Sequence, residues 1–187
     1  MASTSNALVL NNGGQVKIWH AQRDLDKTYG TFTQGHVDNQ TSPNSFYMVY
    51  DKADYGKSEG STTQAKMVSA DPLNDQGRSG NVQFGFTAKS TQGFDLAEPG
   101  IILFEHPKYI GNSAQYFESH ETLDIPARYW NGVSSFIITG GKWELYTKEN
   151  FHQPKVVLNG KTTLGPGYYD DNTAFDDKIK SIRLVEI

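Results

Sequence analysis

The 187-residue chain contains no cysteine, so it has neither a disulfide framework nor a cysteine-ligated metal site. It also lacks a strong charge bias, because 17 basic and 21 acidic residues give a net charge of −4. This balance disfavours a nucleic-acid partner, whose binding depends on a basic surface. No apolar run approaches the roughly 20 residues that span a bilayer, and no signal-peptide core follows the first residues. We therefore expect a cytoplasmic protein with no nucleic-acid or membrane partner.

Aromatic residues and glycine are plentiful. The chain has 10 Tyr, 10 Phe, 3 Trp and 18 Gly. Disordered chains are poor in aromatic residues and carry a high net charge, so this composition argues against disorder. The sequence predicts a turn-rich globular protein.

Alternating polar and apolar residues indicate short β-strands along most of the chain. The expected strands are 15–19, 46–50, 82–86, 101–104, 135–138, 155–158 and 181–187. Clusters of Gly, Asn and Pro separate them, which is typical of a β-sandwich or barrel. Residues 90–100 combine Gly and Pro without alternation, so we expect a linker between two domains, 1–92 and 98–187.

Two sequence elements repeat. The first has the form aromatic-x4-aromatic-x-Gly and occurs at 104–111, again at 146–153 with Gln in the last place, and at 50–57 with Gly one place early. The second precedes an apolar strand at 130–135 and at 176–181. In the first element Gly111 is expected to adopt a positive φ, and Phe104 is expected to pack on Tyr109.

This alternation resembles the βγ-crystallin superfamily, whose Greek-key motif pairs such a hairpin with a later Asn/Asp-Asn/Asp-x-x-Ser/Thr-Ser element. The resemblance covers residues 100–187 well, 46–90 more weakly, and 7–45 only by position and β character. It implies an all-β chain of two Greek-key β-sandwich domains. It also implies a non-enzymatic structural or stress-type protein, for which a monomer is favoured.

The resemblance further implies one calcium ion in the C-terminal domain. In the family, the second element supplies a backbone carbonyl and a hydroxyl, and the partner hairpin supplies the residue after its first aromatic. Carried over, the best candidate site uses the Gly132 carbonyl, the Ser134 hydroxyl and Thr147. Trp130 departs from the pattern, since Asn or Asp is expected there.

A weaker second site would use the Lys178 carbonyl and Glu105. Lys180 stands where the family has a hydroxyl, and an ammonium group adds positive charge without an oxygen donor. Asp176 and Asp177 could partly compensate. In the N-terminal half the corresponding hydroxyl positions are assigned to Asn44 and Gln83, so no metal is expected there.

Other functions have less support. The sequence has no Gly-x-Ser-x-Gly elbow, no cysteine nucleophile and no His-Glu-x-x-His pair. A carbohydrate-binding module is an alternative if aromatics gather on one face, and the candidates are Phe46, Tyr47, Trp130, Trp143, Tyr168 and Tyr169. A small toxin or protease inhibitor on the same fold is a further alternative.

Overall fold

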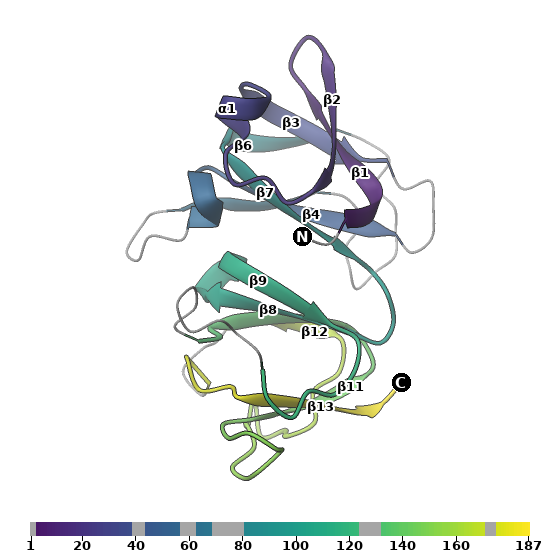
Figure 1. The fold of residues 1–187 in the computed structure, drawn as a ribbon, viewed down its shortest axis with the longest axis vertical. Helices are drawn as coiled ribbons and strands as arrows, with labels where there is room; N and C mark the ends of the chain where they lie inside the picture. Colours follow the sequence, from purple (N-terminus) through teal and green to yellow (C-terminus); the bar gives the residue numbers. More distant parts are fainter. Residues whose placement is uncertain (1–2, 39–43, 57–62, 69–80, 124–131, 171–174) are drawn as a thin grey trace. The chain divides into compact units, whose positions relative to one another are not determined.

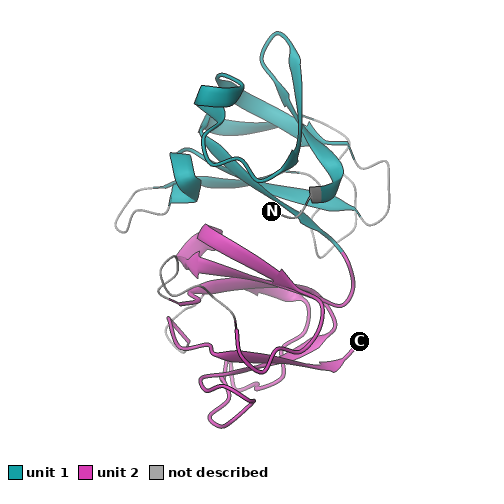
Figure 2. Cartoon of the chain, viewed as in Figure 1, with its two compact units in different colours: residues 1–96 teal, residues 97–187 magenta. Residues whose placement is uncertain are grey.

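The computed structural model describes residues 3–38, 44–56, 63–68, 81–123, 132–170 and 175–187 (Figure 1). The chain divides into two compact units, Met1–Leu96 and Ala97–Ile187 (Figure 2). The predicted linker is wrong in its first half, because Ser90–Asp95 form strand β7. Gly93 belongs in that strand for a packing reason, since a Cβ there would lie 2.5 Å from the ring of Tyr47.

Unit 1 contains two antiparallel sheets (Figure 1). Its elements are β1 (Ser3–Asn11), β2 (Gln15–His20), α1 (Leu25–Thr28), β3 (Phe32–Val37), β4 (Ser45–Tyr50), η1 (Ala53–Gly56), β5 (Ala65–Val68), β6 (Val82–Ala88) and β7 (Ser90–Asp95). The sheet orders are β2-β1-β3-β6 and β5-β4-β7. Strand β6 lies between β5 and β7 in sequence, but it pairs with β3 in the first sheet, as in a Greek key.

Unit 2 repeats this arrangement. Its elements are β8 (Gly100–His106), η2 (Pro107–Tyr109), β9 (Ile110–Tyr116), β10 (Ser135–Gly140), β11 (Lys142–Tyr146), β12 (Gly167–Tyr169) and β13 (Ser181–Glu186). The order β9-β8-β10-β12 matches β2-β1-β3-β6 strand for strand, and β11 pairs with β13. The prediction of an all-β fold with two Greek-key sandwiches is confirmed.

The strand expected at 155–158 does not form. Lys155 makes only an isolated pairing with Tyr146, and Leu158 pairs with Lys161. Asn159 and Gly160 between them have φ of 51° and 74°, so the chain reverses in a two-residue turn. The Val156 N–H donates to the Leu145 carbonyl at 2.8 Å, so the start of the segment runs beside β11 and only its end folds back on itself.

One local structure occurs at each of the three aromatic-x4-aromatic patterns. The second aromatic has a positive φ in every copy: 61° at Tyr55, 61° at Tyr109 and 56° at Phe151. Its ring packs on the first aromatic, with centroids 6.0, 5.5 and 5.8 Å apart in the same order. Gly111 has a φ of 83°, as predicted from the sequence. A bulky residue in the left-handed region is strained, so other interactions must hold these hairpins.

A fully buried serine closes each hairpin, and we call this arrangement the serine clamp. Its hydroxyl accepts a hydrogen bond from the N–H of the second aromatic and donates one to the carbonyl two residues after the first. The bonds are Tyr55 to Ser90 at 3.0 Å and Ser90 to Lys52 at 2.6 Å; Tyr109 to Ser135 at 3.0 Å and Ser135 to His106 at 2.6 Å; and Phe151 to Ser181 at 3.2 Å and Ser181 to Lys148 at 2.7 Å. Each clamp serine begins the last strand of its motif, so one hydroxyl fixes the hairpin against the sheet.

Each unit has its own hydrophobic core. The core of unit 2 includes Phe136, Trp143 and Phe175, and that of unit 1 includes Leu8 and Leu10. Three of the aromatics that the carbohydrate alternative would place on the surface are buried, namely Phe46, Tyr47 and Trp143. Trp130 lies outside the described residues. Tyr168 is 40% exposed, and Tyr169 packs partly buried against the core of unit 2. Three of the six candidates are therefore core residues.

Replacing a clamp serine is expected to destabilise the protein. Ser135→Ala would leave the Tyr109 N–H and the His106 carbonyl without their partner, which costs about 1–3 kcal/mol when the groups are buried. Thermal and urea unfolding of the calcium-free protein measure this cost. Ser134→Ala is the matched control, because the Ser134 hydroxyl bonds to Asp177 only at a long distance of 3.5 Å. Equal losses in the two variants would contradict the role of the clamp.

Candidate metal centre

Two loops and two hairpins meet at one end of unit 2. The Ser134 N–H donates to the Phe104 carbonyl at 3.0 Å, and the Lys180 N–H donates to the Tyr146 carbonyl at 2.8 Å. The Asp177 N–H donates to the Val133 carbonyl at 3.1 Å and ties the two loops together. The predicted ligands lie in these same segments. Gly132, Ser134 and Lys178 belong to the two loops, and Glu105 and Thr147 directly follow the first aromatic of each hairpin.

The first predicted site brings Gly132 and Ser134 against Asp177. A Cβ on Gly132 would lie 2.4 Å from the Asp177 Cα, so no side chain fits there. The Ser134 hydroxyl is buried and donates to Asp177 Oδ1 at 3.5 Å. The sequence assigned Asp177 to the second site only, and the structure adds its carboxylate to the first. In the sequence, the adjacent acidic residues Asp176 and Asp177 were the feature that could have indicated this carboxylate as a ligand.

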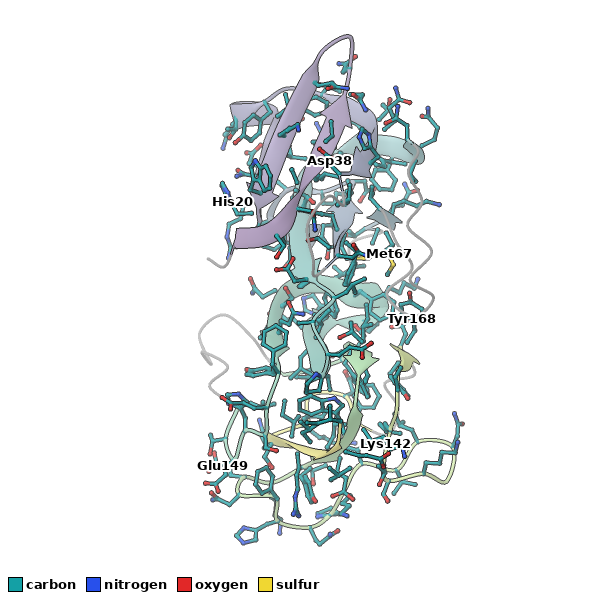
Figure 3. The ribbon with its side chains drawn as sticks, turned by 90° about the vertical axis from the view of Figure 1, so that its right-hand side faces the viewer. His20, Asp38, Met67, Lys142, Glu149 and Tyr168 are labelled. Carbon is teal, nitrogen blue, oxygen red and sulfur yellow. The ribbon has the colours of Figure 1, made fainter. Side chains whose placement is uncertain are left out.

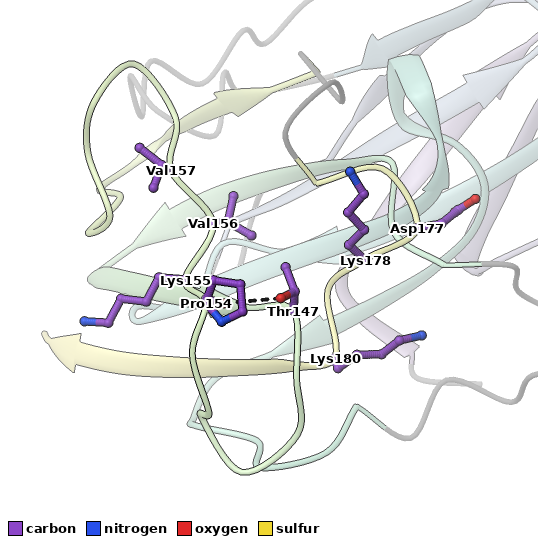
Figure 4. Close-up of a pocket in the computed structure, with 8 residues that line it drawn as sticks. All are labelled: Thr147, Pro154, Lys155, Val156, Val157, Asp177, Lys178 and Lys180. Carbon is purple, nitrogen blue, oxygen red and sulfur yellow. Dashed lines mark hydrogen bonds between the residues drawn. The ribbon is translucent and has the colours of Figure 1, made fainter.

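Thr147 lines a pocket of about 640 Å³, which the loop that carries Asp177 also lines, with the Asp177 side chain directed away from Thr147 (Figure 4). Asp177, Lys178 and Lys180 line the same pocket. The Thr147 N–H and hydroxyl both donate to the Pro154 carbonyl, at 3.1 and 3.3 Å, which fixes the residue in its hairpin. The pocket thus joins the third predicted ligand to the loop that carries Asp177.

The second predicted site is not assembled in the same way. Glu105 is buried, and its Oε2 accepts from the Asn112 N–H at 3.1 Å and from Asn112 Nδ2 at 2.8 Å. This carboxylate is committed to its own hairpin. Among the described residues, neither a hydrogen bond nor an ion pair joins Glu105 to Lys178, and the Lys180 side chain supplies no oxygen.

The two sites differ in how well they fit calcium, which takes six to eight oxygen ligands. The first offers a carbonyl, a hydroxyl and a carboxylate, so it fits a site that water completes. The second has an ammonium group in place of the hydroxyl and does not fit. Within the described ranges, no three His, Cys, Asp or Glu side chains gather to hold a metal.

The serine clamp shows that the second sequence element of unit 1 was aligned wrongly at Gln83. Its serine is Ser90, so the residue at the hydroxyl position is Lys89 rather than Gln83. The Lys89 N–H donates to the Tyr50 carbonyl at 2.8 Å, and its ammonium pairs with Asp26. Gln83 lies within β6, opposite Gln34. A lysine therefore occupies the hydroxyl position in the second motif of both units, at Lys89 and Lys180.

A buried carboxylate lies next to the pocket. Glu144 accepts hydrogen bonds from Lys155 Nζ at 2.5 Å, the Tyr146 hydroxyl at 2.6 Å and the Thr163 hydroxyl at 3.4 Å. Burial alone would raise the pKa of Glu144, but the bonds from Lys155 and Tyr146 outweigh it and leave this pKa below its ordinary value. The Glu144 carboxylate therefore neutralises the positive charge of Lys155, which lines the pocket.

Comparison with known proteins agrees with this architecture. The family model of beta/gamma crystallin matches residues 100–185, so unit 2 is a βγ-crystallin domain. The chain as a whole has the fold of a two-domain βγ-crystallin. It is similar in structure to geodin, a βγ-crystallin from Geodia cydonium, with a TM-score of 0.76 and 20% identity over 97% of this chain and 100% of that one.

Single-domain and distant structures are also similar. A βγ-crystallin from Ciona intestinalis is 28% identical, with a TM-score of 0.38 over 46% of this chain and 99% of that one. Protein S complexed with calcium is 16% identical, with a TM-score of 0.33 over 96% and 99%. No curated protein is significantly similar to the chain in sequence. Within the described residues, no helix has the length and hydrophobicity of a transmembrane span.

Acidification is expected to weaken unit 2 through Glu144. Its lowered pKa means that its contribution to stability is present above the unfolded-state pKa and is lost as the pH falls through the folded-state pKa. Thermal melts across the acidic range measure the effect. Glu144→Gln should be less stable at neutral pH and should lose less on acidification than the parent. Identical pH profiles would show that Glu144 does not contribute.

Proposed function

We propose that this protein is a non-enzymatic, crystallin-like structural protein whose C-terminal domain binds one calcium ion. The proposed ligands are the Gly132 carbonyl, the Ser134 hydroxyl and Thr147, with Asp177 as the charged member. The observation that carries the proposal is the contact of Asp177 with both Gly132 and Ser134. The Asp177 carboxylate and the Ser134 hydroxyl thus both lie close to Gly132, which has no side chain to cover its backbone carbonyl.

The position of the site explains how binding would act on stability. Ser134 directly precedes the clamp serine Ser135, and Asp177 precedes the strand that begins at Ser181. Calcium would supply a positive charge that links these two loops, which belong to different motifs. A ligand that binds only the folded state stabilises it by about 2.7 kcal/mol at a concentration of about 100 times Kd. The proposed function is therefore calcium-linked stability.

Calorimetric titration of the calcium-free protein tests the site. The parent should bind one calcium ion and melt at a higher temperature in its presence. Ser134→Ala and Asp177→Asn should weaken binding by about tenfold or more, because each removes an oxygen ligand or its charge. Glu149→Gln is the matched control, since Glu149 is exposed on the hairpin and carries the same charge as Asp177.

Two results would contradict the proposal. One is the absence of both heat and a melting shift at millimolar calcium. The other is binding that Ser134→Ala, Asp177→Asn and Glu149→Gln leave equally unchanged.

Replacing Lys180 is expected to strengthen calcium binding. Lys180→Ser removes a positive charge from the pocket that Thr147 and Asp177 line, and it restores the hydroxyl at that position. A lower Kd or a second binding event should appear in the titration. Lys161→Ser, in the exposed turn after Gly160, is the control for loss of one positive charge. If both variants bind calcium equally, the local charge of Lys180 has no influence.

A further inference from the structure

Four amide side chains form a row across the outer face of the first sheet of unit 1. In the strand register Gln15 lies opposite Asn11, Asn11 opposite Gln34, and Gln34 opposite Gln83. We call these four residues the amide row. The neighbours Leu10 and Phe84, one position away, belong to the core, so the amides project from the opposite face. The row crosses β2, β1, β3 and β6 and spans about 14 Å, three spacings between strands.

Hydrogen bonds fix the orientation of three of these four side chains, namely Gln83, Gln34 and Asn11. Gln83 Nε2 donates to Gln34 Oε1 at 2.6 Å, and Asn11 Nδ2 donates to Asn81 Oδ1 at 2.7 Å. His36 Nδ1 also lies 2.9 Å from Asn81 Oδ1. Because that oxygen can only accept, His36 Nδ1 is the donor in this contact. The array is thus partly preorganised before any ligand arrives.

The groups that remain available are a mixture of donors and acceptors. Beyond the bonds above, Gln83 Oε1 and Asn11 Oδ1 can accept, whereas Gln34 Nε2 and Asn81 Nδ2 can donate. A phosphate or carboxylate ligand would use only the donors, and a cation only the acceptors. A hydroxyl group uses both, since it donates one hydrogen bond and accepts two.

The rest of the face carries a compensated charge and an aromatic ring. Lys17 lies opposite Val9, as does His36, and its ammonium pairs with Asp38 at 3.2 Å. Figure 3 labels Asp38 in this part of unit 1. Trp19 follows Lys17 by two positions on β2, so it projects from the same face, and it is 45% exposed. The face therefore combines neutral hydrogen bonding with a flat apolar surface.

We propose that this face binds a neutral oligosaccharide chain. The amide row would bond the hydroxyl groups of the sugar, and Trp19 would pack against the apolar face of a ring. Stacking on an aromatic and bonding by fixed amides suit a ligand that is apolar on its faces and rich in hydroxyls at its edge. The site is separate from the aromatics named from the sequence, because Phe46, Tyr47 and Trp143 are buried.

Affinity electrophoresis of the full chain tests this proposal. Native gels would contain hydroxyethylcellulose, laminarin, galactomannan or arabinoxylan, with polygalacturonate as an acidic comparison. Calcium would be removed with a chelator, which separates the result from the proposed calcium site. At least one neutral polysaccharide should retard the protein, and polygalacturonate should retard it less.

Two variants and one control locate the site. Trp19→Ala and Gln83→Ala should each raise the Kd for the polysaccharide, obtained from the retardation, by about tenfold, as expected for central contacts. Phe117→Ala is the control, because Phe117 is also 45% exposed but lies in unit 2. It should bind as the parent does, and melting curves would confirm that all three variants fold. Lack of retardation by every neutral polysaccharide, preference for polygalacturonate, or equal binding by all three variants would overturn the proposal.

Discussion

The serine clamp is the interaction on which most of this structure depends. Tyr55, Tyr109 and Phe151 adopt a backbone conformation that bulky residues avoid, and a buried hydroxyl bonds to each of their N–H groups. The same hydroxyl begins the last strand of the motif. One side chain therefore couples a strained hairpin to a sheet, and this coupling occurs three times among the described residues. Loss of the hydroxyl would release the hairpin and the strand together.

The candidate metal centre is a consequence of the clamp. The residue before each clamp serine is placed beside the first aromatic by its own N–H, as at Ser134, Lys180 and Lys89. Its side chain then decides whether oxygen or positive charge is presented. Only Ser134 offers a hydroxyl among these three, and Asp177 lies against it. The repeat thus builds equivalent positions, and single residues make them chemically different.

Unit 1 has specialised elsewhere. Lys89 is paired with Asp26, while the outer face of the four-stranded sheet carries a neutral set of amides beside Trp19. A sandwich must bury only one face of each sheet, so the other face is free to vary without loss of the core. This freedom allows two units with the same strand order to differ in what they present to solvent.

Resemblance of the repeated elements to a known family led to the Greek-key class. From its residues alone, the sequence predicted the aromatic pairs, the positive φ at Gly111 and six of the seven expected strands, because these features depend on neighbours along the chain. It failed at β7, at 155–158 and at the clamp of unit 1, where Ser90 rather than a residue near Gln83 closes the hairpin. Those outcomes depend on the lengths of intervening segments and on pairing between distant strands. Only the tertiary structure placed Asp177 against Ser134 and aligned Gln15, Asn11, Gln34 and Gln83, because register between strands is fixed by packing of the whole sheet.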